Sequence, residues 1–106
     1  MTDGPVIYMR IHAAGDQTIL AACDKEILGK TLMKGDLQFK ISEHFYGGDL
    51  VNNETFIMMI KQVTSANIVG NHCVGLLLEA GIIDEDSVVE IDNVMHTQVY
   101  RISMDR

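Results

Sequence analysis

The sequence contains no tryptophan and only one proline, and none of its apolar runs approaches the roughly 20 residues of a membrane-spanning helix. The first five residues have neither the basic start nor the apolar stretch of a signal peptide. We therefore expect a cytoplasmic protein that does not associate with membranes. The 106 residues are 47% hydrophobic and 22% charged, a balance that excludes disorder and predicts one globular domain over residues 1–106.

Cysteines and basic side chains are also few. Cys23 and Cys73 lie far apart in the chain and outside any CxxC motif, which predicts two free thiols. The 8 basic residues face 15 acidic ones, and the net charge of −7 opposes non-specific attraction to a polyphosphate backbone. Four lysines nevertheless gather within residues 25–40, so the position of positive charge matters more than its sum.

The first half of the chain has mainly strand patterns. Residues 6–12 alternate between apolar and other side chains, and a second strand-like run at 18–23 follows a turn at 14–16, which together predict an opening hairpin. Asp24 is placed to cap a single helical turn. Residues 37–41 again alternate, after a Gly-Asp turn and a short run at 31–34. This half therefore predicts a hairpin followed by one or two further strands.

The second half begins with two helical patterns. Asn52 or Asn53 can cap a helix that extends to about Ser65, and a second helix near residues 71–80 ends at Gly81. The chain closes with runs at 87–91 and 94–102 around an Asp-Asn turn, which is a hairpin pattern. The predicted order is β-hairpin, β, α, α, β-hairpin. Because this order lacks regular βα alternation, we expect an α+β domain with a mixed or mostly antiparallel sheet and two helices on one face.

No residue pattern identifies a catalytic or metal site. The four histidines lack the spacing of metal ligands, and no phosphate-binding glycine motif occurs, so we expect neither a metal nor a cofactor. His44 and His96 stand beside polar or aromatic residues and are the candidates among the histidines. Cys73 near a helix start could have a lowered thiol pKa, although an inert buried cysteine is the more frequent outcome.

Two segments are candidate binding sites. Residues 65–72 are predicted to form the turn between the two helices, where amide side chains and free N–H groups could hold an anion or simply cap the backbone. Residues 44–48 combine two aromatic side chains with two glycines, close in sequence to Lys40. This segment could stack a base or a peptide, and we expect Phe45 to be buried and Tyr46 to be partly exposed.

At these same segments the chain resembles a family of small archaeal proteins, the domain of unknown function 424. The resemblance covers nearly the whole length and is carried by Phe45-Tyr46-Gly47-Gly48, by residues 64–70, by residues 79–88 and by His96-Thr97-Gln98. Met95 and Thr97 depart from the Pro and Ala that related chains tend to have. The resemblance implies an archaeal cytoplasmic protein and assigns no catalytic residue.

Positions singled out by the residue patterns, most of them also by the resemblance, form the predicted binding site: Lys40, His44, Tyr46, Gly47, Gly48, Ser65, Asn67, His96 and Gln98. The favoured function is a non-enzymatic binding module whose partner is RNA or a ribonucleoprotein, or else another protein. One alternative is a small enzyme with a pocket at residues 65–70 that uses Cys73 or the His44/His96 pair. Another is a structural subunit that forms a homodimer through the final hairpin, with the last strand as an exposed edge.

Overall fold

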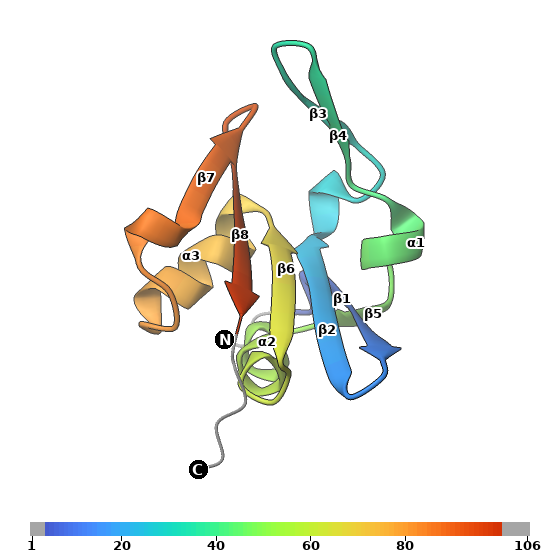
Figure 1. Ribbon diagram of the computed structural model, residues 1–106, viewed down its shortest axis with the longest axis vertical. Helices are drawn as coiled ribbons and strands as arrows, with labels where there is room; N and C mark the ends of the chain where they lie inside the picture. Colours follow the sequence, from blue (N-terminus) through green and yellow to red (C-terminus); the bar gives the residue numbers. More distant parts are fainter. Residues whose placement is uncertain (1–3, 101–106) are drawn as a thin grey trace.

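A computed structural model describes residues 4–100, and within this range the chain folds into a six-stranded sheet, a separate two-stranded hairpin and three α-helices (Figure 1). The order of strands in the large sheet is β5-β1-β2-β6-β8-β7. The β2–β6 pair is parallel, and every other neighbouring pair in this sheet is antiparallel. The expected α+β class and mixed sheet are confirmed.

Both expected hairpins are present in the large sheet. The opening hairpin joins β1 (Ile7–Ala14) to β2 (Gln17–Asp24), and the closing hairpin joins β7 (Val88–Ile91) to β8 (Val94–Tyr100). Asp92 and Asn93 both have positive φ, of 56° and 65°, as a type I′ turn requires. Strand β8 lies between β6 and β7, so the expectation that the last strand is an edge is wrong. Among the described strands, β5 (Asp49–Val51) and β7 form the edges of this sheet.

The segment expected as a turn between helices is instead the central strand β6 (Ser65–Val69). Helix α2 (Asn53–Ile60) ends before it and α3 (Asn71–Glu79) begins after it. Strand β6 pairs with β2 on one side and with β8 on the other. These partners are remote in sequence, which is why the local pattern of five residues did not predict a strand.

Helices α2 and α3 cover one face of the sheet, as expected. Their buried side chains Phe56, Ile60, Val74 and Leu77 pack into a core with the inward-facing residues of β1, β2 and β6. Asn52 caps α2 by accepting a hydrogen bond from the backbone amide of Thr55 at 2.9 Å. The end of α3 is a Schellman motif in which the amide of Ile82 donates to the carbonyl of Leu77 at 3.0 Å.

The opposite face of the sheet has a second and smaller core. There, α1 (Glu43–Tyr46) and the hairpin of β3 (Thr31–Lys34) and β4 (Leu37–Lys40) pack over β2 and β6 through Leu32, Ile41 and Tyr46. The β3–β4 hairpin extends beyond the end of the large sheet (Figure 1). We call this side of the sheet the hairpin face. Two 3-10 turns, Lys25–Ile27 and Glu85–Ser87, complete the described elements.

No helix within residues 4–100 is both long enough and apolar enough to span a membrane.

Candidate functional site

The strand register brings most of the predicted site residues together on the hairpin face. Residues that lie directly opposite one another on neighbouring strands point to the same side of the sheet. Asn67 pairs with Gln98 on β8, Ser65 pairs with Tyr100, and Val69 pairs with His96. Three cross-strand rows therefore define this face: Tyr8, Cys23, Val69, His96 and Val89; Arg10, Ala21, Asn67 and Gln98; His12, Ile19, Ser65 and Tyr100.

Asn67 is the centre of a hydrogen-bonded cluster on this face. Its Oδ1 accepts a hydrogen bond from the hydroxyl of Tyr46 at 2.7 Å and lies 3.0 Å from Nε2 of His96. The three side chains come from α1, β6 and β8, three elements that are distant in sequence. The cluster therefore exists only in the folded chain, and the sequence could indicate its members but not their contact.

Tyr46 is the most buried member of this cluster. Its side chain is 2% exposed, whereas Phe45 is half-buried. The expected burial of Phe45 and exposure of Tyr46 is therefore reversed. Burial, with a smaller contribution from Cys23, raises the pKa of the Tyr46 hydroxyl, which remains a neutral hydrogen-bond donor. Phe45 instead stacks on the ring of His12, with centroids 4.7 Å apart and planes inclined by 14°.

His96 is half-buried beside the β3–β4 hairpin. The ring of Phe39 is tilted against it at a centroid distance of 5.2 Å. The hairpin is held above this end of the sheet because the backbone amide of Met33 donates to the Asp92 carboxylate at 3.2 Å. Burial lowers the pKa of His96 from its ordinary value of 6.5. The imidazole is therefore neutral at pH 7.

The remaining predicted residues surround this cluster or lie apart from it. Gln98 is exposed in the row next to His96, and Ser65 is half-buried one row further along the strands. Lys40 and His44 are exposed. The alternation of β4 places Lys40 on the side of the hairpin opposite to Phe39, whereas Lys34 is on the same side as Phe39.

Gly47 and Gly48 lie where α1 meets the first strand. A Cβ atom on Gly48 would overlap the carbonyl oxygen of Met9, so close backbone approach requires glycine there. The Arg10 guanidinium donates to the Gly47 carbonyl, from Nε at 3.1 Å and from a terminal nitrogen. The glycine pair thus fastens α1 to β1.

Three residues of the hairpin face were missed by the sequence interpretation. Arg10 and His12 alternate with the buried Ile7 and Met9 along β1, and this alternation was the signal that could have found them. His12 also lies 2.9 Å from the carbonyl oxygen of Phe45 through Nε2. Tyr100 is 78% exposed at the end of β8 and extends the aromatic surface.

The start of α3 does not offer the anion site that the sequence left open. The carboxylate of Asp24 already occupies it, accepting hydrogen bonds from the amides of His72 and Cys73, each at 2.9 Å. Asp24 was expected to cap the turn that follows it, but no side-chain cap is formed there.

Cys73 does not have the environment of a nucleophile. It is fully buried, and burial together with the negative charge of Asp24 raises its pKa well above 9.0. The expected inert buried cysteine is therefore confirmed, and the alternative of a lowered pKa is wrong. Cys23 is likewise buried and free. Among residues 4–100, no group of three or more His, Cys, Asp or Glu side chains is placed to hold a metal ion.

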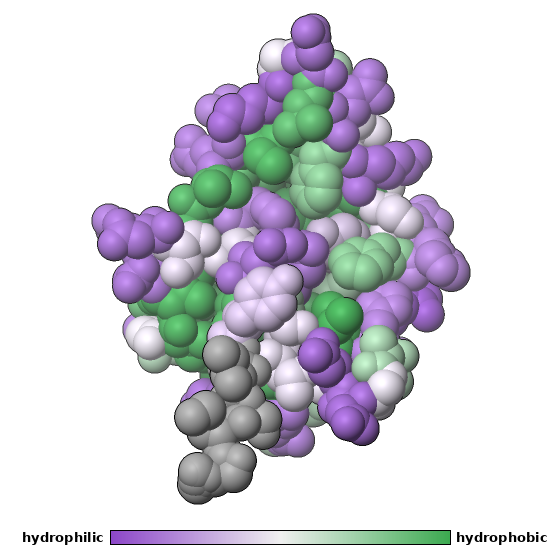
Figure 2. Space-filling view, viewed as in Figure 1, coloured by the Kyte–Doolittle hydropathy of each residue, from purple (hydrophilic) through white to green (hydrophobic). Residues whose placement is uncertain are grey.

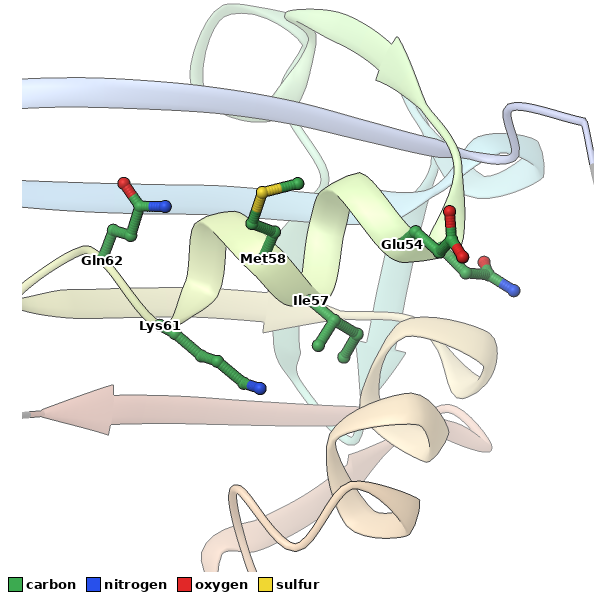
Figure 3. Close-up of a pocket in the computed structure, with 6 residues that line it drawn as sticks. Glu54, Ile57, Met58, Lys61 and Gln62 are labelled. Atoms are coloured by element: carbon green, nitrogen blue, oxygen red, sulfur yellow. The ribbon is translucent and has the colours of Figure 1, made fainter.

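One hollow on the surface lies away from this cluster. It runs along the outer side of α2 and is lined only by residues of that helix and the two residues that follow it (Figure 3). Ile57 and Met58 project to opposite sides of the helix there. The hollow contains no cluster of polar side chains from several elements, so it is a weaker candidate than the hairpin face.

Fold and site together define a small α+β domain that presents polar and aromatic side chains on one face of a mixed sheet. Residues 12–102 match the family described as "Protein of unknown function (DUF424)", and the chain belongs to this family. The chain is also similar to a solved structure described as an uncharacterized conserved protein from Methanopyrus kandleri, with 27% identity and a TM-score of 0.81. That match covers 94% of this chain and 95% of the other. No curated protein matches the chain.

Proposed function

We propose that this protein is a non-enzymatic binding module and that the hairpin face binds single-stranded RNA. The observation that carries the proposal is the row structure of this face, in which the exposed Gln98 and Tyr100 lie beside the half-buried Asn67 and His96. These side chains come from neighbouring strands and form one continuous surface. The space-filling view shows hydrophilic surface in the middle of this face and hydrophobic surface towards the β3–β4 hairpin (Figure 2).

This combination of side chains suits unpaired bases. Exposed aromatic rings on a sheet stack against bases, and side-chain amides form hydrogen bonds with base edges. Tyr100 has the exposure that stacking requires, and Gln98 carries both donors and an acceptor. Paired bases in a duplex are already stacked, so the surface fits single strands better than duplexes.

Positive charge is available beside the face despite the acidic total. Lys34 lies on the hairpin side that carries Phe39, and Lys30 and Lys40 are exposed nearby in sequence. With so few cations, only a small number of phosphates can be contacted. We expect the affinity to fall with added salt with a slope of roughly 0.7 per phosphate contact on single strands.

The test is fluorescence anisotropy with a labelled, unstructured 12-nucleotide RNA at low salt. Tyr100→Ala is expected to weaken binding about tenfold, because stacking on one aromatic ring contributes on the order of 1–3 kcal/mol per base. Lys34→Glu is expected to weaken binding and to flatten its salt dependence.

Lys61→Glu is the matched control because it changes the charge by the same amount as Lys34→Glu. Lys61 is the C-cap of α2, which covers the opposite face of the sheet. It should leave the affinity within about twofold, as expected for a residue outside the contact surface. Absence of RNA binding, or an equal loss with Lys61→Glu and Lys34→Glu, would contradict the proposal.

A further inference from the structure

The orientation of His96 is determined by the hydrogen bond that Asn67 makes with it. Oδ1 of Asn67 has no hydrogen to donate, and it already accepts from the hydroxyl of Tyr46. The contact of 3.0 Å with Nε2 of His96 therefore requires the proton of the neutral imidazole to be on Nε2. The other ring nitrogen, Nδ1, then carries a lone pair and can only accept.

Nδ1 of His96 has no hydrogen-bond partner among the described residues and is not fully buried. Among the described residues, no buried side-chain nitrogen or oxygen atom lacks a hydrogen-bond partner. The one hydrogen bond of the His96 ring within this part of the chain is made through Nε2, and its one ring contact is with Phe39. If Nδ1 were fully buried, it would be a buried nitrogen atom without a partner. Because there is no such atom, some of the surface of Nδ1 is accessible to solvent.

The surroundings of His96 keep this lone pair available near neutral pH. Burial lowers the pKa of the ring, so the imidazole does not take up a second proton at pH 7. The side chains that form its hydrogen bond and its ring contact are those of Asn67 and Phe39, and neither is charged. The Phe39 ring lies beside the imidazole, with ring centroids 5.2 Å apart, and provides an apolar surface next to it that suits a flat heterocycle.

We propose that His96 is a specificity-determining residue whose Nδ1 accepts a hydrogen bond from the exocyclic amine of an unpaired cytosine or adenine. This inference rests on the proposed RNA-binding function and names the class of base that the hairpin face prefers. Cytosine and adenine present an amino group on the edge where uracil and guanine present a carbonyl oxygen. A carbonyl oxygen placed against the Nδ1 lone pair would leave two acceptors facing each other without a proton.

Asn67 acts in this scheme as a positioning residue. Asn67 does not itself bind the base in this scheme. Its hydrogen bond determines which ring nitrogen of His96 is protonated, and the hydroxyl of Tyr46 holds Asn67 in place. Replacing Asn67 with alanine frees the ring to place its proton on either nitrogen. The preference for amino-bearing bases should then shrink more than the overall affinity does.

The experiment compares the affinities of oligocytidylate, oligoadenylate and oligouridylate of 12 nucleotides at pH 7.5. The amino-bearing oligomers should bind about fivefold or more tightly than oligouridylate, as expected for one hydrogen bond gained and one repulsive contact avoided. His96→Phe keeps an aromatic ring against Phe39 and should abolish this ratio while some affinity remains. His72→Phe, at an exposed histidine on α3, is the matched control and should preserve the ratio.

A second measurement is independent of RNA. Nitrogen-15 NMR of the imidazole ring should show the Nε2–H tautomer for His96 in the wild-type protein, and loss of this preference in Asn67→Ala. An Nδ1–H tautomer in the wild type would overturn the inference. Equal affinities for the three oligomers would overturn it and leave the proposed function standing, whereas failure of all three to bind would overturn both.

Discussion

The carboxylate of Asp24 fills the space in which a Cβ atom of residue 70 would lie, so Gly70 and Asp24 are matched to each other across the end of the sheet. Gly70 has φ of 131°, a conformation that side chains with a Cβ rarely adopt. The residue before α3 therefore cannot provide a capping side chain of its own. Asp24, from the end of β2, supplies the missing acceptor to the amides of His72 and Cys73.

Gly70→Ala should destabilise the protein by about 3 kcal/mol or more, because the substitution combines backbone strain with displacement of the Asp24 carboxylate. Gly75→Ala is the matched control, since Gly75 lies within α3 and a Cβ there meets no atom within 4 Å. That change should be neutral or stabilising by up to about 1 kcal/mol. Urea denaturation of both variants provides the comparison, and a similar loss in each would show that Gly70 has no special role.

Asp24→Asn should lower the free energy of unfolding by about 1–3 kcal/mol. Each carboxylate oxygen accepts one backbone amide, at 2.9 Å in both cases, whereas an asparagine must present its NH₂ group to one of these donors. Asp36→Asn, in the exposed turn between β3 and β4, is the reference for a surface aspartate and should change the stability by less than about 0.5 kcal/mol. An unchanged urea midpoint for Asp24→Asn would mean that these hydrogen bonds contribute nothing net.

Both cysteines should resist alkylation in the folded protein. Burial, followed by the charges of Asp24 and Glu26, raises the pKa of Cys23 to about 12, and burial raises that of Cys73 well above 9.0. Because the thiolate is the reactive form, iodoacetamide at about pH 8.5 should modify neither residue natively and both in urea. Mass spectrometry of the whole protein counts the adducts. Rapid native modification of Cys73 alone would restore the sequence-based idea of a reactive thiol.

The stability should decrease as the pH falls below neutrality, through His96. Its folded-state pKa lies below 6.5, so on acidification the unfolded chain takes up the proton first. The contribution of the neutral His96 to the free energy of unfolding is therefore fully present above pH 6.5, and it is lost as the pH falls towards the folded-state pKa. His96→Phe should make urea midpoints between pH 8 and pH 5.5 less dependent on pH than in the wild type. An identical pH dependence in the two proteins would assign the effect to other groups.

The features predicted correctly from the sequence are those that short segments determine. The positive φ of Asp92 and Asn93 follows from the preference of these residue types for a tight hairpin turn. The end of α3 follows from Gly81, whose φ is 73°. Asn52 caps α2 through the amide of Thr55, only three residues further along the chain. Each of these signals acts over a few residues and needs no knowledge of the rest of the fold.

The errors concern residues whose surroundings come from distant parts of the chain. Strand β6 has buried residues on both faces, and its pairing with β2 and β8 overrides a pattern that looked like a turn between helices. Tyr46 is buried in the smaller core, where its hydroxyl reaches Asn67, 21 residues away. Asp24 caps a helix 48 residues away instead of the turn beside it. No local pattern contains these partners, although Tyr46, Asn67 and His96 had each been singled out from the sequence.

Strand β6 is the only element through which the two terminal hairpins share hydrogen bonds within the described sheet. The row of Arg10, Ala21, Asn67 and Gln98 runs across β6 and extends from β1 to β8. A molecule bound along that row would contact both the opening and the closing hairpin and would stabilise the sheet against their separation. The amides of β6 are thus the natural reporters of occupancy, and their hydrogen exchange should slow whenever the hairpin face is filled.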